Sequence, residues 1–288
     1  MDRNRICLLS FILLIVLAGV VSGSNDLKVF YLNTSHGDAT LLESSGHFMM
    51  INAGDQQDFP VVKDYLKNTS VTMLDYAFAS SLNESAIGGM ADLMGEFPVS
   101  VYTDPSASFS SPSHDKVVKK IDSDQIGYQE AAPGASLPFG SATIQILNRS
   151  TSANNASENA ISLTVTLGEV SFLFTGNQDL GPTPATIWEV PDQGRGGSFD
   201  SLSAISPKVL VISTGTGSLD KKTLETIKKQ NLTPLMTNAD GNIVITTDGN
   251  NYSAVTSNGR TLQKPGPVAT PTPKPTQVLG NNTVSKGK

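Results

Sequence analysis

The first stretch whose position suggests chemistry is a polar bend, residues 81–86, which follows an apolar strand predicted over 74–79. A helix start with two glycines, Gly88 and Gly89, comes next. In α/β proteins, functional groups are often placed where a strand ends at a loop before a helix. This bend contains no histidine, cysteine or aspartate. It has the position of a functional loop without the side chains that usually bind zinc.

Histidine and cysteine are scarce in the whole chain. The one cysteine, Cys7, excludes a disulfide framework and a Cys-based metal site. We expect it to serve only as a small apolar residue of the N-terminal segment. The histidines are His36, His47 and His114, and no two lie within ten residues of each other. A multi-His metal cluster would therefore require distant segments to converge.

Acidic side chains offer another route to catalysis. Asp38 could act as a general base beside His36, although a polar turn is the simpler expectation. Asp55 and Asp58 could bind a cation, but we expect them to be solvated loop acids. A relocated hydrolase site would draw on some of four acids: Asp38, Asp55, Asp179 and Asp192.

The charge is unevenly distributed. The chain has 26 acidic and 20 basic residues, a net charge of −6. The first 23 residues hold two arginines and one aspartate, and the tail from Lys264 holds four lysines and no acid. The body between them therefore has 14 basic and 25 acidic residues, a net charge of −11. Because phosphate-backbone binding depends on clustered Lys and Arg, this balance disfavours nucleic acid as a partner.

The two ends have the composition of export and linker segments. Two arginines precede an apolar run at 6–21, which predicts a signal peptide or an uncleaved membrane anchor over residues 1–23. Residues 264–288 are rich in Pro and Thr and predict an extended tail. We expect an extracellular or cell-surface protein. Sequons, which matter only after export into a glycosylating pathway, begin at Asn33, Asn68, Asn83, Asn148, Asn155, Asn231, Asn251 and Asn281.

The elements between these ends alternate. Apolar runs predict strands at 27–32, 39–42, 48–51, 74–79, 99–102, 142–147, 161–167, 170–174, 187–190, 209–213, 235–237, 242–247 and 252–256. Helical spacing appears at 60–66, 87–97, 115–121, 199–205 and 220–229, whereas 136–140 predicts a turn and 148–159 a polar loop. Met90, Leu93 and Met94 form an apolar helix stripe, and we expect them and Trp188 in the core. Residues 24–263 thus predict one α/β domain with two sheets face to face and helices outside.

Seven short segments follow one another along the chain: N-T-S-H-G-D-A at 33–39, M-I-N-A-G at 50–54, S-S-L-N-E-S-A-I-G-G at 80–89, F-L-F-T-G-N at 172–177, V-P-D-Q-G-R at 190–195, P-K-V-L-V-I-S at 207–213 and D-G-N-I-V-I-T-T-D-G at 240–249. In this order they resemble the motifs of the metallo-β-lactamase-fold domain of competence DNA-uptake (ComEC-type) proteins. The resemblance spans about residues 27–256 and implies an αββα sandwich of two mixed sheets. The family uses two divalent metal ions, usually zinc or manganese.

Carried over position by position, the resemblance implies a degenerate metal centre. The family's metal-binding histidines and aspartates fall on Ser81, Asn83, Ser85, Ala86, Asn177, Asp192 and Gln193. A further family aspartate, which contacts the metal ligands but not the metal, falls on Asn52. The aspartate of the family's first turn falls on Asn33. Hydrolysis catalysed by a bound zinc ion requires imidazoles and carboxylates that converge on the ion. We therefore expect no metal cofactor, and no catalytic residue in the cleft where the family binds its metal ions.

Three functions follow as hypotheses. The first is a non-catalytic binding or structural module at the cell surface, with Ser81, Asn83, Ser85, Asn177 and Asp192 lining its cleft. The second is a phosphodiesterase-like hydrolase with an atypical site. The third is an accessory in DNA uptake, which rests on the resemblance alone. The partner is unknown, apart from the membrane if the N-terminal segment is not cleaved.

Overall fold

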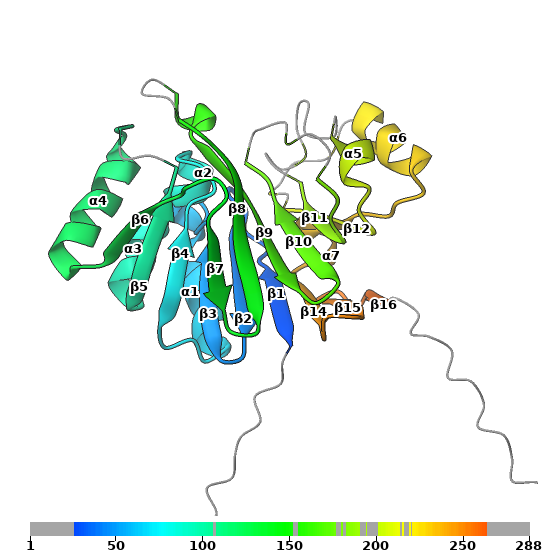
Figure 1. Cartoon of the computed structure of the whole chain (residues 1–288), viewed down its shortest axis with the longest axis horizontal. Helices are drawn as coiled ribbons and strands as arrows, with labels where there is room; N and C mark the ends of the chain where they lie inside the picture. Colours follow the sequence, from blue (N-terminus) through cyan, green and yellow to red (C-terminus); the bar gives the residue numbers. More distant parts are fainter. Residues whose placement is uncertain are drawn as a thin grey trace, which may run out of the picture.

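The computed structural model describes residues 26–105, 108–151, 155–176, 180, 183–190, 194, 201–213, 215, 219 and 221–263 (Figure 1). The predicted signal segment and the predicted tail lie outside these residues. Within the described part, no helix has both the length and the apolar character needed to cross a membrane.

The first sheet joins the N-terminal half of the chain to the C-terminal hairpin. In the described residues it has nine strands, in the order β16-β15-β14-β1-β2-β3-β4-β5-β6. Their bounds are β1 Leu27–Tyr31, β2 Thr40–Ser44, β3 His47–Ile51, β4 Leu74–Phe78, β5 Val99–Asp104, β6 Gly127–Glu130, β14 Ile243–Thr247, β15 Tyr252–Thr256 and β16 Thr261–Gln263. β1 lies between β2 and β14 and is antiparallel to both, so Leu27 pairs with Thr247. β3 and β4 are parallel, so their carboxyl ends meet.

The second sheet is built from the middle of the chain. Its described strands number seven, in the order β13-β12-β11-β10-β9-β8-β7. Their bounds are β7 Ser136–Phe139, β8 Ala142–Ser150, β9 Ala160–Leu167, β10 Val170–Phe174, β11 Ile187–Glu189, β12 Val209–Ile212 and β13 Leu235–Met236. β10 to β13 are parallel, whereas β7 to β10 form antiparallel hairpins.

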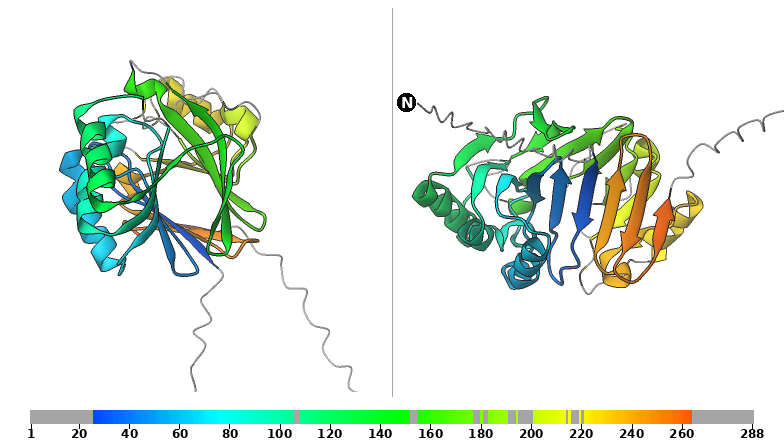
Figure 2. Two further views of the ribbon diagram at one scale, coloured as in Figure 1. Left: turned by 60° about the vertical axis from the view of Figure 1, so that its left-hand side comes forward. Right: turned by 90° about the horizontal axis from the view of Figure 1, so that it is seen from below.

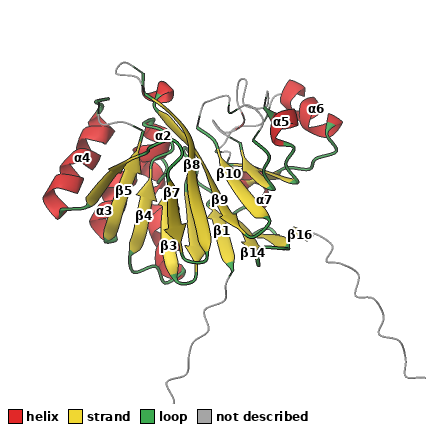
Figure 3. Cartoon of the chain, in the orientation of Figure 1, coloured by secondary structure: helices red, strands yellow, loops and turns green. Residues whose placement is uncertain are grey.

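Helices cover the outer face of each sheet. α1 Phe59–Asn68, α2 Glu84–Ile87, α3 Met90–Glu96 and α4 Pro112–Asp124 accompany the first sheet, and α5 Leu202–Ile205 and α6 Lys221–Lys229 the second. α7 Thr237–Asp240 precedes β14, and short 3-10 turns span Gln56–Asp58 (η1) and Ala156–Glu158 (η2). Figure 2 shows the two sheets facing each other, and Figure 3 shows the helices outside them.

Three apolar clusters fill the spaces between four layers. Successive side chains of a strand point to opposite faces, and β1 uses both: Val29 and Tyr31 face the second sheet, whereas Phe30 packs under the helices. A third cluster joins the second sheet to α5 and α6. The predicted αββα sandwich of two mixed sheets is therefore confirmed.

Three local predictions were wrong. Residues 136–140 form strand β7 rather than a turn, and Pro138 suits its place at the sheet edge. The predicted loop at 148–159 begins later, because β8 continues to Ser150. The single helix predicted over 87–97 is two helices separated at Gly88 and Gly89. These glycines press against other backbone: a Cβ on Gly88 would lie 2.6 Å from the Gln56 nitrogen.

A buried ion pair fixes α4 to β5. His114 Nε2 lies 3.1 Å from Asp104 Oδ2, and both side chains are almost fully buried. The Tyr128 hydroxyl donates to the other oxygen of Asp104 at 2.9 Å. Burial opposes the charged imidazole, but the hydrogen bond and charge of Asp104 outweigh it and raise the pKa of His114. The Phe109 carbonyl acts in the same direction.

This pair predicts a pH-dependent stability. A histidine whose folded pKa is raised stabilises the fold fully below its unfolded pKa, about 6.5, and loses that effect as pH rises through the folded pKa. We expect His114→Gln to lower the free energy of unfolding by about 1.5–3 kcal/mol in weak acid, with a smaller deficit in alkali. Urea unfolding across pH measures this difference. His47→Gln is the control, because the His47–Asp75 pair is half exposed and should contribute little.

Candidate functional site

The candidate site lies where β3 and β4 end together. Asn52 follows β3, and residues 79–83 connect β4 to α2. The predicted polar bend, residues 81–86, therefore comprises the end of this connection and the first three residues of α2. Ser81 and Ala86 are buried, whereas Asn83 and Ser85 are partly exposed. The predicted site residues Asn177, Asp192 and Gln193, with Asp179, lie outside the described residues.

Asn52 is the centre of the polar contacts in this region. Its backbone has a φ of 58°, the left-handed region that asparagine tolerates better than most residues. Its amide nitrogen donates to Asp38 Oδ2 and to Ser80 Oγ, both at 2.8 Å. Its amide oxygen accepts from the Ser80 backbone nitrogen at 2.8 Å. The side chain therefore connects the Asp38 turn, the end of β3 and the polar bend.

Backbone hydrogen bonds join the same three segments. The Asp38 nitrogen donates to the Ser85 carbonyl at 3.0 Å, and the Ala53 nitrogen donates to the Ala86 carbonyl at 2.8 Å. Gly37 allows this close approach, because a Cβ there would lie 2.3 Å from the Ser85 oxygen. The bend is thus held by main-chain contacts that do not depend on the identity of its own side chains.

The bend also contacts the second sheet directly. The Ile161 nitrogen donates to the Ser80 carbonyl at 2.8 Å, and Ser81 forms an isolated antiparallel bridge with Ala160. Ser162, on the same strand, accepts from the Gly176 nitrogen at 3.1 Å. The bend and the start of β9 therefore form one continuous main-chain contact between the sheets.

Asp58 differs from the solvated loop acid that we expected. It is 2% exposed. Its carboxylate accepts from the backbone nitrogens of Ser35, His36 and Asp55 at 2.9–3.2 Å. The His36 ring lies 3.3 Å away. Asp55 is also in use, since it accepts from the Gln57 nitrogen and caps η1. Both acids therefore organise loops.

The sequence reasoning missed Glu189, the most unusual group of the site. It ends β11, is 5% exposed, and its Oε1 accepts from Ser213 Oγ at 2.8 Å and from Thr40 Oγ1 at 3.3 Å. The Asp38 carboxylate, two residues before Thr40 in the chain, lies beside this carboxyl. Burial, with the charge of Asp38, raises the pKa of Glu189 well above its usual value. An acid inside the apolar run I-W-E-V was the signal that could have found it.

Trp188 is a core residue, as predicted. It is 1% exposed, and its indole nitrogen donates to Thr175 Oγ1 at 3.0 Å. That hydroxyl in turn donates to the Glu189 carbonyl at 3.3 Å. Trp188 thus supports the strand that carries Glu189.

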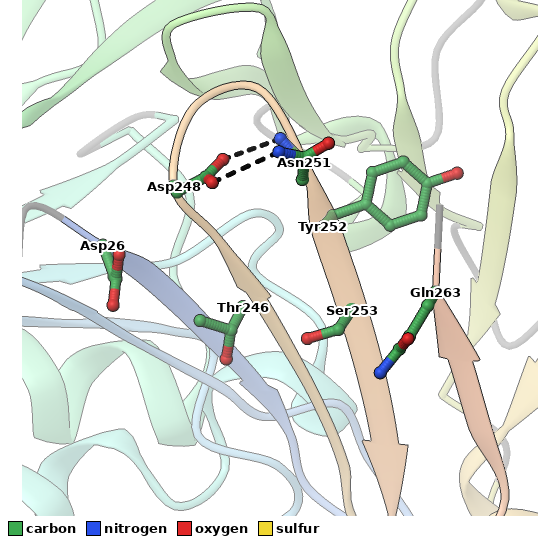
Figure 4. Close-up of a pocket in the computed structure, with 7 residues that line it drawn as sticks. All are labelled: Asp26, Thr246, Asp248, Asn251, Tyr252, Ser253 and Gln263. Carbon is green, nitrogen blue, oxygen red and sulfur yellow. Dashed lines mark hydrogen bonds between the residues drawn. The ribbon is translucent and has the colours of Figure 1, made fainter. Parts of the chain in front are cut away.

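Neither a group of metal ligands among the described residues nor the hollow drawn in Figure 4 lies at the bend. Within the described residues, no group of three or more His, Cys, Asp or Glu side chains is placed to hold a metal ion. A hollow of about 350 Å³ lies at the opposite end of β1 from the bend. Figure 4 shows the side chains that line it. It is lined by Asp26, Thr246, Asp248, Asn251, Tyr252, Ser253 and Gln263. Asp248 accepts from the backbone of its own turn, so that acid organises the hairpin.

Comparison with known proteins identifies this architecture. No protein family model and no curated protein sequence matches the chain. Among solved structures, the metallo-β-lactamase fold protein YhfI from Bacillus subtilis matches with a TM-score of 0.50 and 12% identity, over 73% of this chain and 95% of that one. Igni18, a metallo hydrolase from the archaeon Ignicoccus hospitalis, matches with a TM-score of 0.50 and 12% identity, over 83% and 100%.

A third structure, the E377D mutant of the CmlA β-hydroxylase, matches with a TM-score of 0.52 and 10% identity, over 73% of this chain and 52% of that chain. The chain therefore spans about half the length of this enzyme. At such identities the likeness concerns the fold, and together with the two facing mixed sheets it shows that the protein has the metallo-β-lactamase fold.

Proposed function

We propose that this protein is a non-catalytic binding or structural module with the metallo-β-lactamase fold, exported to the cell surface. The observation that carries the proposal is the use of Asn52. Its side chain makes hydrogen bonds to Asp38 and Ser80 and is 1% exposed, so it supports the loops instead of a metal ligand. The polar bend offers hydroxyl, amide and methyl groups at Ser81, Asn83 and Ala86, which are poor ligands for a hydrolytic zinc.

Export is proposed from the sequence, on the basis of the two arginines and the apolar run at 6–21. The ComEC-type relationship and the degenerate metal centre are proposed from the ordered sequence motifs, and glycosylation from the sequons. A role in DNA uptake would follow from that relationship alone, and the net charge of −11 in the body opposes it. DNA binding that weakens with salt would support it.

Metal analysis tests the main proposal. We expect the purified full chain, incubated with zinc or manganese and then dialysed, to retain far less than about one equivalent of metal. Elemental analysis measures the content, and a metallo hydrolase of the same fold, such as Igni18, is the positive control. Retention of about one or two tightly bound equivalents would overturn the proposal.

A hydrolase is the second candidate, and a specific observation favours it. Asp38 is partly exposed at the site and lies beside the buried carboxyl of Glu189, an arrangement that could exchange protons with a substrate. Hydrolysis of bis(p-nitrophenyl) phosphate that Asp38→Asn or Asp192→Ala abolishes would support this candidate. Inactivity across a panel of divalent metals would reject it.

A further inference from the structure

Glu189 and Asp38 approach each other from different sheets. Glu189 belongs to β11 of the second sheet, whereas Asp38 precedes β2 of the first sheet. Thr40 on β2 crosses the same space to Glu189 Oε1, which Ser213 reaches from the second sheet. The Glu189 carboxyl therefore takes part in a polar contact that joins the sheets, and the Asp38 carboxylate lies beside it.

One buried carboxyl oxygen of the Asp38–Glu189 pair lacks a hydrogen-bond donor. Glu189 Oε1 accepts from two hydroxyls, and Asp38 Oδ2 accepts from the Asn52 amide. Asp38 Oδ1 is buried, and it accepts no hydrogen bond from an N–H, hydroxyl or amide group of the described residues. A protonated Glu189 carboxyl supplies the missing donor, because a neutral acid carries one O–H. Two ionised carboxylates in this contact would repel each other.

Charge in the surroundings favours the same assignment. Among the described residues, neither carboxyl has a Lys, Arg or His partner. The other titratable group facing Glu189 is Tyr31 on β1, whose pKa is raised by burial and by both acids, so it stays neutral. The Glu189 carboxyl accepts from the hydroxyls of Thr40 on β2 and Ser213 after β12. Thr175, which follows β10, donates to the backbone carbonyl of Glu189.

We infer that Asp38 and Glu189 share one proton and form a carboxyl–carboxylate latch between the two sheets, which weakens when the proton leaves. The proton resides on Glu189, the more deeply buried acid, and Asp38 Oδ2 accepts from the Asn52 amide. The inference concerns the fold and does not depend on the proposed function.

The latch makes stability depend on pH in a defined direction. The folded pKa of Glu189 is raised above its unfolded value, so the folded state holds a proton that the unfolded state releases. Its contribution is fully present below the unfolded pKa and is lost as pH rises through the folded pKa. The unfolding midpoint of the wild type should therefore fall from weakly acidic to alkaline pH.

Glu189→Gln tests the latch, because glutamine donates permanently to Asp38 and can still accept from Thr40 and Ser213. We expect the variant to match the wild type in acid and to unfold at higher urea concentration in alkali. His114 also titrates in the same direction, but it is present in both proteins and cancels in their difference. Asp38→Asn is the matched second variant, and its profile should also be flatter than that of the wild type.

Infrared spectroscopy of the unsubstituted full chain tests the proton directly. At neutral pH we expect a carbonyl band of a protonated carboxylic acid, which disappears in Glu189→Gln. Absence of that band in the wild type would overturn the inference, whether or not the variants fold. Parallel pH profiles for the wild type and a folded Glu189→Gln variant would overturn it as well.

Discussion

Gly37→Ala is expected to lower the free energy of unfolding by about 4 kcal/mol, near the upper end of single-substitution effects. A Cβ at this position would lie 2.3 Å from the Ser85 oxygen, 2.5 Å from the Asp55 nitrogen and 2.6 Å from the Gly54 Cα. These are backbone atoms, so no side chain can rotate to make room. The Asp38 turn and the bend would have to separate, with loss of the Asp38–Ser85 hydrogen bond. Urea denaturation measures the change.

Gly95→Ala is the matched control for this prediction. Gly95 lies in α3, and a Cβ there would meet only the flexible end of Lys120, at 3.7 Å. Alanine should stabilise this helix by roughly 0.5–1 kcal/mol, because it restricts the unfolded chain more than glycine does. Equal unfolding midpoints for the two variants would show that the loops are not packed against Gly37.

Asn52→Ala has the second largest expected effect, a loss of about 3 kcal/mol. The substitution leaves Asp38 Oδ2, Ser80 Oγ and the Ser80 nitrogen without the partners they have in the buried site. The positive φ adds a backbone cost of about 1 kcal/mol for alanine. Urea denaturation again measures the difference from the wild type.

Two further substitutions at this position separate the causes. Asn52→Gly removes the side chain but accepts the left-handed backbone, so it should be less harmful than Asn52→Ala. Asn52→Asp keeps the shape but places a carboxylate against Asp38, and its deficit should be larger at neutral pH than in acid. An Asn52→Asp variant as stable as the wild type at every pH would contradict the described hydrogen bonds.

The layered fold could be predicted because its signals are local. The apolar run at 27–32 predicted a strand, and β1 forms there. The stripe of Met90, Leu93 and Met94 predicted a buried helix face, and all three residues are buried. The order of strands and helices then left few architectures. β7 was missed because a short edge strand with a proline looks like a turn until its partner is known.

The candidate site was less predictable, because its contacts join distant segments. The motif resemblance placed Asn52 correctly at the end of β3 but indicated only a missing charge, whereas its role depends on Asp38 and Ser80. Asp58 looked like a solvated acid because nothing local shows that the Ser35 and His36 amides point at it. Glu189 and Asp38 meet only after both sheets have formed, and no spacing pattern encodes that contact.

The place of β1 between β2 and β14 has a consequence for the order of folding. Leu27 cannot find its partner Thr247 until almost the whole domain has been synthesised. Until then, β1 presents an open edge that another chain could pair with. Contacts between residues so far apart in sequence slow folding, since a long loop must close before they form. Pairing of the β14–β15 hairpin with β1 is therefore a late step of folding. A chain interrupted before this hairpin would be prone to aggregate.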